Sequence, residues 1–137
     1  NKFQIGKAVT VSEGKDVSIF STGTMLQQAL DAAKILNEKG ISAELIHFAT
    51  IKPLDGDAVI KSAKKTGAVV TVEEHNINGG FGSAIAEFLV KNNPCRVQMI
   101  GINDCFGESG TLKSLYEKYG LTGRHIADAA EKMMKNR

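Results

Sequence analysis

Three polar side chains that could do acid–base chemistry follow one another in the segment VEEHNINGGFG, residues 72–82. Glu73 and Glu74 precede His75, and a carboxylate beside a histidine can orient the imidazole as a general acid or base. The alternative is a partly exposed loop histidine beside solvated carboxylates, which the residues support at least as well. The segment therefore predicts a polar rim, and a catalytic role stays open.

The glycines of the same segment, Gly79, Gly80 and Gly82, come just before a helical pattern that begins at about Ser83. Backbone N–H groups at such a helix start can bind an anion. However, the sequence has neither the dinucleotide pattern G-x-G-x-x-G nor the P-loop ending Gly-Lys-Ser/Thr at this place. We therefore favour a sharp strand-to-helix turn, with a positive φ or a close contact at Gly80 or Gly82.

Other polar residues fall at the ends of expected strands. These candidates are Ser21, Thr22, Asn76, Asp104, Cys105, Glu108 and Ser109. A nucleophilic pair of Cys105 with His75 would require two separate loops to meet, and no cysteine signature supports it. Cys95 and Cys105 match no metal-ligand spacing, so we interpret them as free thiols in a reducing compartment, the cytoplasm.

Strand and helix patterns alternate along the chain. The expected strands are residues 7–11, 17–21, 43–48, 67–74 and 96–102. The expected helices begin at Thr24, at Asp55 or Asp57, at Ser83, at Thr111 and at Thr122. Such alternation predicts an α/β sandwich with a mainly parallel sheet, whose sites form outside the carboxyl ends of the strands.

The first helix carries the clearest local signals. Thr24 with Gln27 three residues later matches a capping box, and Gly40 is a plausible stop. Periodicity places Leu26, Leu30 and Ala33 on its apolar face, with Met25, Ala29 and Leu36 at the margins. Gly120 is the expected left-handed cap between the last two helices. The connection of residues 12–16 is too short for a crossover helix, so the residues alone favour an antiparallel hairpin of the first two strands.

Composition narrows the function classes. The chain has 137 residues, of which 42% are hydrophobic and 23% charged, and a formal net charge of +2. This size fits a single domain over residues 1–137. The small net charge gives no support for nucleic acid or anionic membranes as partners. The start at Asn1, without methionine and close to a strand pattern, favours a piece of a longer chain.

Three segments in order resemble one family. GKDVSIFSTGTMLQQALDAAKILNEKGISAELIHFATIKPLD resembles the start of the C-terminal domain of the transketolase family. TVEEHNINGGFGSAIAEFL resembles its glycine turn, and IGINDCFGESGTLKSLYEKYGLT its closing motif. The resemblance runs from about Gly6 to Lys135. Deoxyxylulose-phosphate synthase and 2-oxoacid dehydrogenase beta subunits share the domain, but the residues Phe106 to Gly110 favour transketolase, and the close spacing is most similar to the short, split type.

The resemblance implies a fold and a function. The fold is a three-layer α/β/α sandwich with a five-stranded mixed sheet in the order 1-3-2-4-5 and strand 1 antiparallel, and we take this order over the hairpin. The whole enzyme would transfer a two-carbon ketol unit between sugar phosphates in the cytoplasmic pentose phosphate pathway, as a homodimer with thiamine diphosphate and a divalent metal, Mg²⁺.

The same resemblance assigns no catalytic, cofactor-binding or metal residue to this chain, because the family's cofactor motifs have no counterpart in it. The domain would support assembly and dimerisation with the remaining transketolase domains or an N-terminal subunit, and would be inactive alone. The candidate rim or interface residues are Glu73, Glu74, His75, Gly79, Gly80, Gly82, Asp104 and Glu108. A hypothesis from another class is an interaction or regulatory module that binds an anion at the helix start after Gly80.

Overall fold

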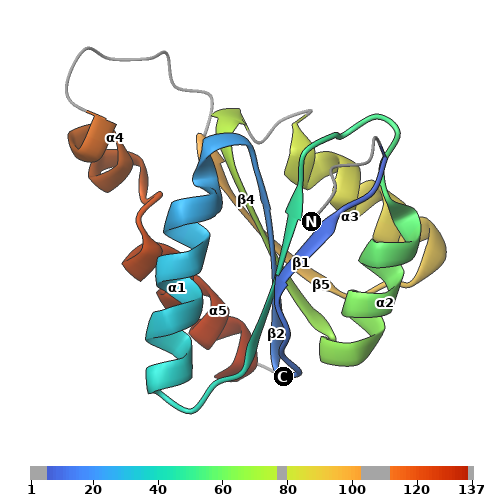
Figure 1. The fold of residues 1–137 in the computed structure, drawn as a ribbon, viewed down its shortest axis with the longest axis horizontal. Helices are drawn as coiled ribbons and strands as arrows, with labels where there is room; N and C mark the ends of the chain where they lie inside the picture. Colours follow the sequence, from blue (N-terminus) through green and yellow to red (C-terminus); the bar gives the residue numbers. More distant parts are fainter. Residues whose placement is uncertain (1–5, 77–79, 103–111, 136–137) are drawn as a thin grey trace.

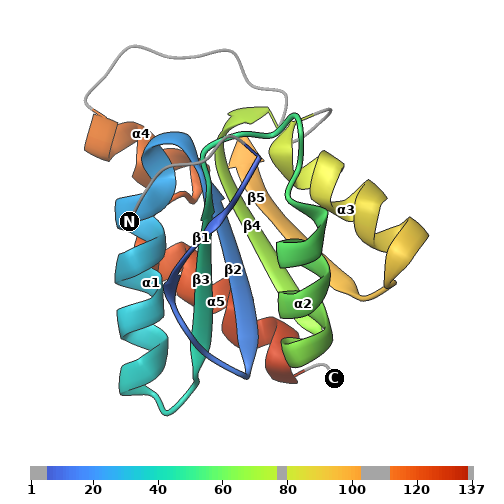
Figure 2. The ribbon, with the colours of Figure 1, turned by 45° about the vertical axis from the view of Figure 1, so that its right-hand side comes forward.

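The computed structural model describes residues 6–76, 80–102 and 112–135. Its strands form one five-stranded sheet in the order β1-β3-β2-β4-β5, which Figure 2 shows across the molecule. The strands are β1 (Val9–Ser12), β2 (Val17–Thr22), β3 (Ala43–Phe48), β4 (Ala68–Asn76) and β5 (Arg96–Ile102). β1 pairs antiparallel with β3, and the other neighbours are parallel. The family order is therefore confirmed.

The hairpin that the residues alone favoured is wrong, because the connection after β1 crosses the start of β3. The backbone N–H groups of Asp16 and Val17 both donate to the Ser42 carbonyl, at 2.8 and 3.3 Å. A Cβ atom on Gly14 would overlap the backbone of Ala43, so only glycine lets the chain pass this closely. The connection thus leaves β1 and β2 on opposite sides of β3.

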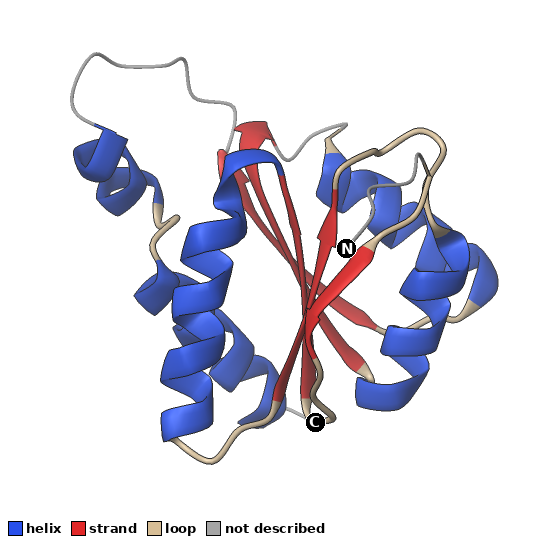
Figure 3. Cartoon of the chain, in the orientation of Figure 1, coloured by secondary structure: helices blue, strands red, loops and turns tan. Residues whose placement is uncertain are grey.

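Helices cover both faces of the sheet and make the three layers (Figures 1 and 3). The helices are α1 (Leu26–Glu38), α2 (Gly56–Thr66), α3 (Phe81–Asn92), α4 (Leu112–Tyr119) and α5 (Gly123–Lys135). Figure 1 shows α1, α4 and α5 on one side and α2 and α3 on the other. Gly40 and Gly120 have φ angles of +78° and +70°, which confirms both predicted stops.

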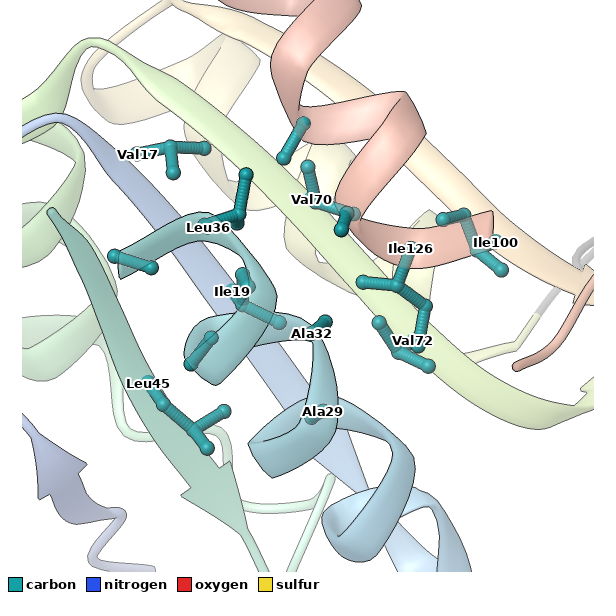
Figure 4. Packing of buried hydrophobic residues seen from close by; sticks show 14 of the residues in the cluster. Val17, Ile19, Ala29, Ala32, Leu36, Leu45, Val70, Val72, Ile100 and Ile126 are labelled. Atoms are coloured by element: carbon teal, nitrogen blue, oxygen red, sulfur yellow. The ribbon is translucent and has the colours of Figure 1, made fainter. Parts of the chain in front are cut away.

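The core on the side of α1 and α5 is built from strand valines and isoleucines against small helix residues (Figure 4). Val70, Val72 and Ile19 rise from the sheet, and Ala29 and Ala32 let α1 lie close to them. Burying such side chains stabilises the fold by about 25 cal/mol for each Å² of apolar surface removed from water. The core on the side of α2 and α3 centres on three aromatic rings, Phe20, Phe48 and Phe81.

Two details of α1 differ from the sequence-based expectation. A single 3-10 turn, η1 (Gly23–Met25), precedes the helix, so the N-cap is Met25 and no capping box forms. Ala33 is buried as expected, whereas the other expected central residues, Leu26 and Leu30, are only partly buried. The remaining buried helix residues are Ala29, Ala32 and Leu36, so the apolar face is shifted toward the side of the expected margin residues Ala29 and Leu36.

Candidate functional site at the carboxyl ends of the strands

The carboxyl ends of β2, β3 and β4 lie together at one edge of the sheet, where the sequence predicted the site. The structure places Ser21, Thr22, Glu73, Glu74, Gly80 and Gly82 at this edge. His75 and Asn76 are the last two residues of β4. Outside the described residues lie Gly79, Asp104, Cys105, Glu108 and Ser109.

Glu73 is not a solvated rim carboxylate, which corrects the expectation. Its side chain is 0% exposed and lies under the start of α3. One carboxylate oxygen accepts the backbone N–H of Phe81 at 2.8 Å, and the other accepts the N–H of Gly82 at 2.7 Å. The cause is the alternation of β4: Val70 and Val72 face α1 and α5, so Glu73 faces α3.

This contact decides what the glycine turn can bind. The first N–H groups of a helix have no partner within the helix, and their partial positive charge favours an anion. Here the Glu73 carboxylate fills that role from inside the protein. An added phosphate or carboxylate would have to displace Glu73 or approach its negative charge. The geometry therefore disfavours the anion-binding hypothesis for the start of α3.

Gly82 makes the close approach that the turn was predicted to need. A Cβ on Gly82 would lie 2.6 Å from Oγ1 of Thr71 and 3.0 Å from Oε2 of Glu73. Gly80 is the N-cap with extended backbone, at φ −93° and ψ −158°. Neither glycine is among the left-handed positions. The prediction is thus confirmed as a close contact at Gly82, and its alternative of a positive φ is wrong.

Glu74, the next residue, points to the opposite face and joins two helical segments. Its Oε2 accepts the hydroxyl of Thr24 in η1, and its Oε1 accepts the hydroxyl of Tyr116 in α4 at 3.0 Å. Thr24 therefore contacts the rim instead of capping α1. Burial is the main cause that raises the pKa of the Tyr116 hydroxyl; Thr24 opposes it, and the Glu74 carboxylate adds to it. Through these two hydrogen bonds, Glu74 links η1 and α4 to β4.

A Ser–His pair at the same edge escaped the sequence analysis. Oγ of Ser21 lies 2.9 Å from Nδ1 of His47, and the two residues are neighbours in the parallel register of β2 and β3. Burial lowers the pKa of His47, which favours the neutral imidazole. Ser21 is 0% exposed, so its hydroxyl cannot reach a substrate and the pair is not a nucleophilic dyad. Strand register was the only signal that could have found it.

The described residues offer no metal centre or membrane span. Within these ranges, His, Cys, Asp and Glu side chains form no group of three or more that could hold a metal ion. No described helix is long and apolar enough to cross a membrane. Cys95 is a half-buried free thiol, and burial raises the pKa of that thiol. In the described part of the edge, the polar side chains discussed above thus form hydrogen bonds within the chain itself.

Comparison with known proteins gives the family. Residues 6–126 match the family described as "Transketolase, C-terminal domain". The chain belongs to this family. The resemblance found in the three sequence segments is therefore confirmed, and so is the fold that it implied.

Relatives show the same assignment over nearly the whole chain. The 6-deoxy-6-sulfo-D-fructose transketolase subunit SqwH of Clostridium sp. is 46% identical over 137 residues, which cover 100% of this chain and 42% of that protein. The 1-deoxy-D-xylulose-5-phosphate synthase of Heliobacterium modesticaldum is 42% identical over 130 residues, 94% of this chain and 20% of that protein.

A solved structure agrees with both. It is described as "Split gene transketolase, inactive beta4 tetramer", with a TM-score of 0.94 and 46% identity, and the match covers 98% of this chain and 44% of that one. This transketolase family chain thus spans less than half the length of each of these three proteins.

Proposed function

We propose that the chain is the C-terminal domain of a transketolase that, as a whole, transfers a two-carbon ketol unit between sugar phosphates with thiamine diphosphate and Mg²⁺. In this proposal the domain supports assembly and dimerisation, and the reaction takes place on the remainder of the protein, in the cytoplasm. The family match over residues 6–126 supports the assignment, as does the share of about two fifths that the chain covers in SqwH.

The observation that carries the assembly role is the occupied start of α3. A diphosphate group needs N–H donors and positive charge, whereas Glu73 already accepts the N–H groups of Phe81 and Gly82 and brings negative charge to this point. The described residues at the carboxyl edge therefore do not fit the cofactor. Because the cofactor supplies the carbanion chemistry, the proposal places the reaction on another part of the protein.

The rim is the surface that we assign to that partner. Glu74 fixes η1 and α4 at the edge through Thr24 and Tyr116, so two helical segments meet the next domain as one rigid unit. The candidates Gly79, Asp104 and Glu108 belong to the same proposed surface by their sequence positions. In the proposal this surface contacts the remaining transketolase domains or an N-terminal subunit.

Mixing the chain with the remainder of its parent protein tests the proposal. A coupled ketol-transfer assay should find activity in the mixture and none with the 137-residue chain alone. Thr24 is exposed at the edge, so Thr24→Arg should lower the activity of the mixture by weakening association. Lys64→Glu, an exposed change in α2 on the other side of the sheet, is the matched control. Full activity of the chain alone would contradict the proposal.

A second candidate is the same domain in a deoxyxylulose-phosphate synthase. The 42% identity with the Heliobacterium enzyme favours it, although the identity with SqwH is higher at 46%. The motif Phe106 to Gly110 favours transketolase. A donor-substrate screen of the whole protein separates the two activities, because it shows which donor is turned over.

A further inference from the structure

Strand β1 forms one open edge of the sheet. It is the outermost strand in the order of the sheet and pairs with β3 on one side. Figure 2 shows β1 at the front of the molecule, with α1 and α2 to either side of it. The main-chain N–H and C=O groups along the outer side of an edge strand can pair with a further strand. A second chain can therefore extend the sheet at this edge.

The side chains of β1 leave an apolar residue at the surface. Val11 is 38% exposed, which is unusual for a large hydrophobic side chain among the described residues. The register with β3 shifts between Thr10 and Ser12, as in a β-bulge, and Val11 is the extra residue. Bulges commonly redirect a side chain at the edge of a sheet. The valine is therefore available for a contact outside the domain.

The sequence of this edge is self-complementary. Residues 7–13 are KAVTVSE, with Lys7 and Glu13 at equal distances from Thr10 and one valine on each side of it. In an antiparallel pair of two copies centred on Thr10, Lys7 of one copy lies opposite Glu13 of the other. The two valines also lie opposite each other. Opposite charges and β-branched side chains in such cross-strand positions stabilise a pair of strands, whereas a parallel pair in register would bring like charges together.

The two charges at the ends of this segment are not neutralised by the described part of the chain. Lys7 and Glu13 are exposed, and neither forms an ion pair with another described residue. The Asp55 carboxylate accepts the N–H of Ala8 at 2.8 Å, so main-chain pairing with a second copy is limited to about Val9–Ser12. A pair of this length belongs to the small interfaces, below roughly 1,200 Å², so we expect weak association.

We propose that β1 is an association surface for a second copy of this chain. The two β1 strands pair antiparallel about a two-fold axis at Thr10 and join the two sheets into one. Each copy gives its Lys7 to the Glu13 of the other, as the symmetry requires. The inference names a surface for the dimerisation proposed above and rests on that proposal in this respect. Ketol transfer by the mixture is a separate measurement, so failure of the strand pairing and failure of the proposed activity are distinguishable.

Sedimentation equilibrium of the 137-residue chain at low ionic strength tests the pairing. Over about 10 μM to 1 mM we expect a monomer–dimer equilibrium with a dissociation constant on the order of 10⁻⁴ M. Lys7→Glu and Glu13→Lys each place like charges opposite each other and should weaken the dimer roughly tenfold. The double variant that exchanges both charges should recover the parental constant. Lys64→Glu in α2 changes the net charge as Lys7→Glu does and is the matched control.

Cross-linking locates the axis. Thr10→Cys places two cysteines opposite each other, with Cα atoms about 4.5–5.5 Å apart, which is within reach of a disulfide. Oxidation should therefore give a covalent dimer of Thr10→Cys above the background of the parent chain. Lys15→Cys, five residues from the axis, should stay at that background. The proposal is overturned by a monomer at 1 mM, by a dimer that the exchanged double variant does not restore, or by equal cross-linking of the two cysteine variants.

Discussion

The carboxylate of Glu73 accepts the backbone N–H of Gly82 at 2.7 Å, so a strand residue caps the helix that follows it eight residues along the chain. The contact explains two features of the segment together. The glycine lets the helix come close enough to β4 for the bond to form, and the buried carboxylate supplies the acceptor that the helix start needs. The segment is therefore a structural joint.

Replacing Glu73 tests this joint. Glu73→Ala leaves the N–H groups of Phe81 and Gly82 buried without their acceptor, and each such loss costs roughly 1–3 kcal/mol. Glu73→Gln keeps one acceptor oxygen and should destabilise less. Urea unfolding gives the free energies, with the exposed Glu87→Gln in α3 as the matched control. An alanine variant as stable as the control would contradict the capping role.

The sign of the stability change in Gly82→Ala tests the close contact at Gly82. In an open helix position Gly→Ala stabilises by up to about 1 kcal/mol. Here the new Cβ would lie 2.6 Å from Oγ1 of Thr71, so Gly82→Ala should lower the free energy of unfolding. Gly80→Ala should be tolerated, because the backbone there is extended.

A double variant locates the clash. Oγ1 of Thr71 is buried and has no hydrogen-bond partner among the described residues, so Thr71→Ala should cost little by itself. Combined with Gly82→Ala it should recover part of the lost stability. Thermal melts of the four proteins measure the coupling, and strict additivity would show that the strain comes from elsewhere.

An ion pair between the buried carboxylate of Glu44 and the exposed Lys65, at the opposite end of the sheet, predicts a pH dependence. Burial raises the pKa of Glu44, but hydrogen bonds from Lys65, Ser62 and the Gly14 N–H outweigh burial and hold it below the ordinary value of 4.5. Its contribution to stability is therefore present above that value and is lost as the pH falls through the lowered pKa.

Glu44→Gln isolates this contribution. The variant should be less stable than the parent at pH 7, and the difference should shrink as the pH falls below 4.5. Urea unfolding across this pH range measures it, with the exposed Glu38→Gln of α1 as control. A difference that is independent of pH would mean that packing, and not the charge, is responsible.

The tie at Glu74 can be measured by a double-mutant cycle. Tyr116→Phe removes one hydroxyl donor and should cost about 1 kcal/mol. In the Glu74→Gln background, Tyr116→Phe should lower the free energy of unfolding by less, because the acceptor of the Tyr116 hydroxyl has already lost its charge. If the two changes affect the free energy of unfolding independently, the bond from Tyr116 to Glu74 does not hold α4 at this edge.

Much of the fold could be predicted, because hydrophobic periodicity is local. The bounds of β3 and β5, residues 43–48 and 96–102, agree with the predicted strands. Of the two predicted starts of α2, Asp55 and Asp57, it is Asp55 that caps the helix, by accepting the N–H of Ala58. The strand order could not be obtained this way, since the residues alone favoured a hairpin. Only the family resemblance, which summarises long-range pairing, placed β1 beside β3.

The candidate site was harder to predict, because its contacts join residues far apart in the sequence. Two adjacent acids looked equally exposed, yet Glu73 caps α3 on one face and Glu74 ties η1 to α4 on the other. Strand alternation predicts that the two side chains point to opposite faces of the sheet, but it does not predict which helix packs against each face. The Ser21–His47 pair likewise depends on the register between β2 and β3.

The central claim, that this transketolase family domain holds no cofactor site of its own, is tested most directly by calorimetric titration of the 137-residue chain with thiamine diphosphate and Mg²⁺. A ligand that does not bind the folded state cannot stabilise it, so a parallel melt serves as a check. We predict no saturable heat and an unchanged melting temperature. Micromolar binding accompanied by a rise in melting temperature would contradict the account and place cofactor chemistry on this domain.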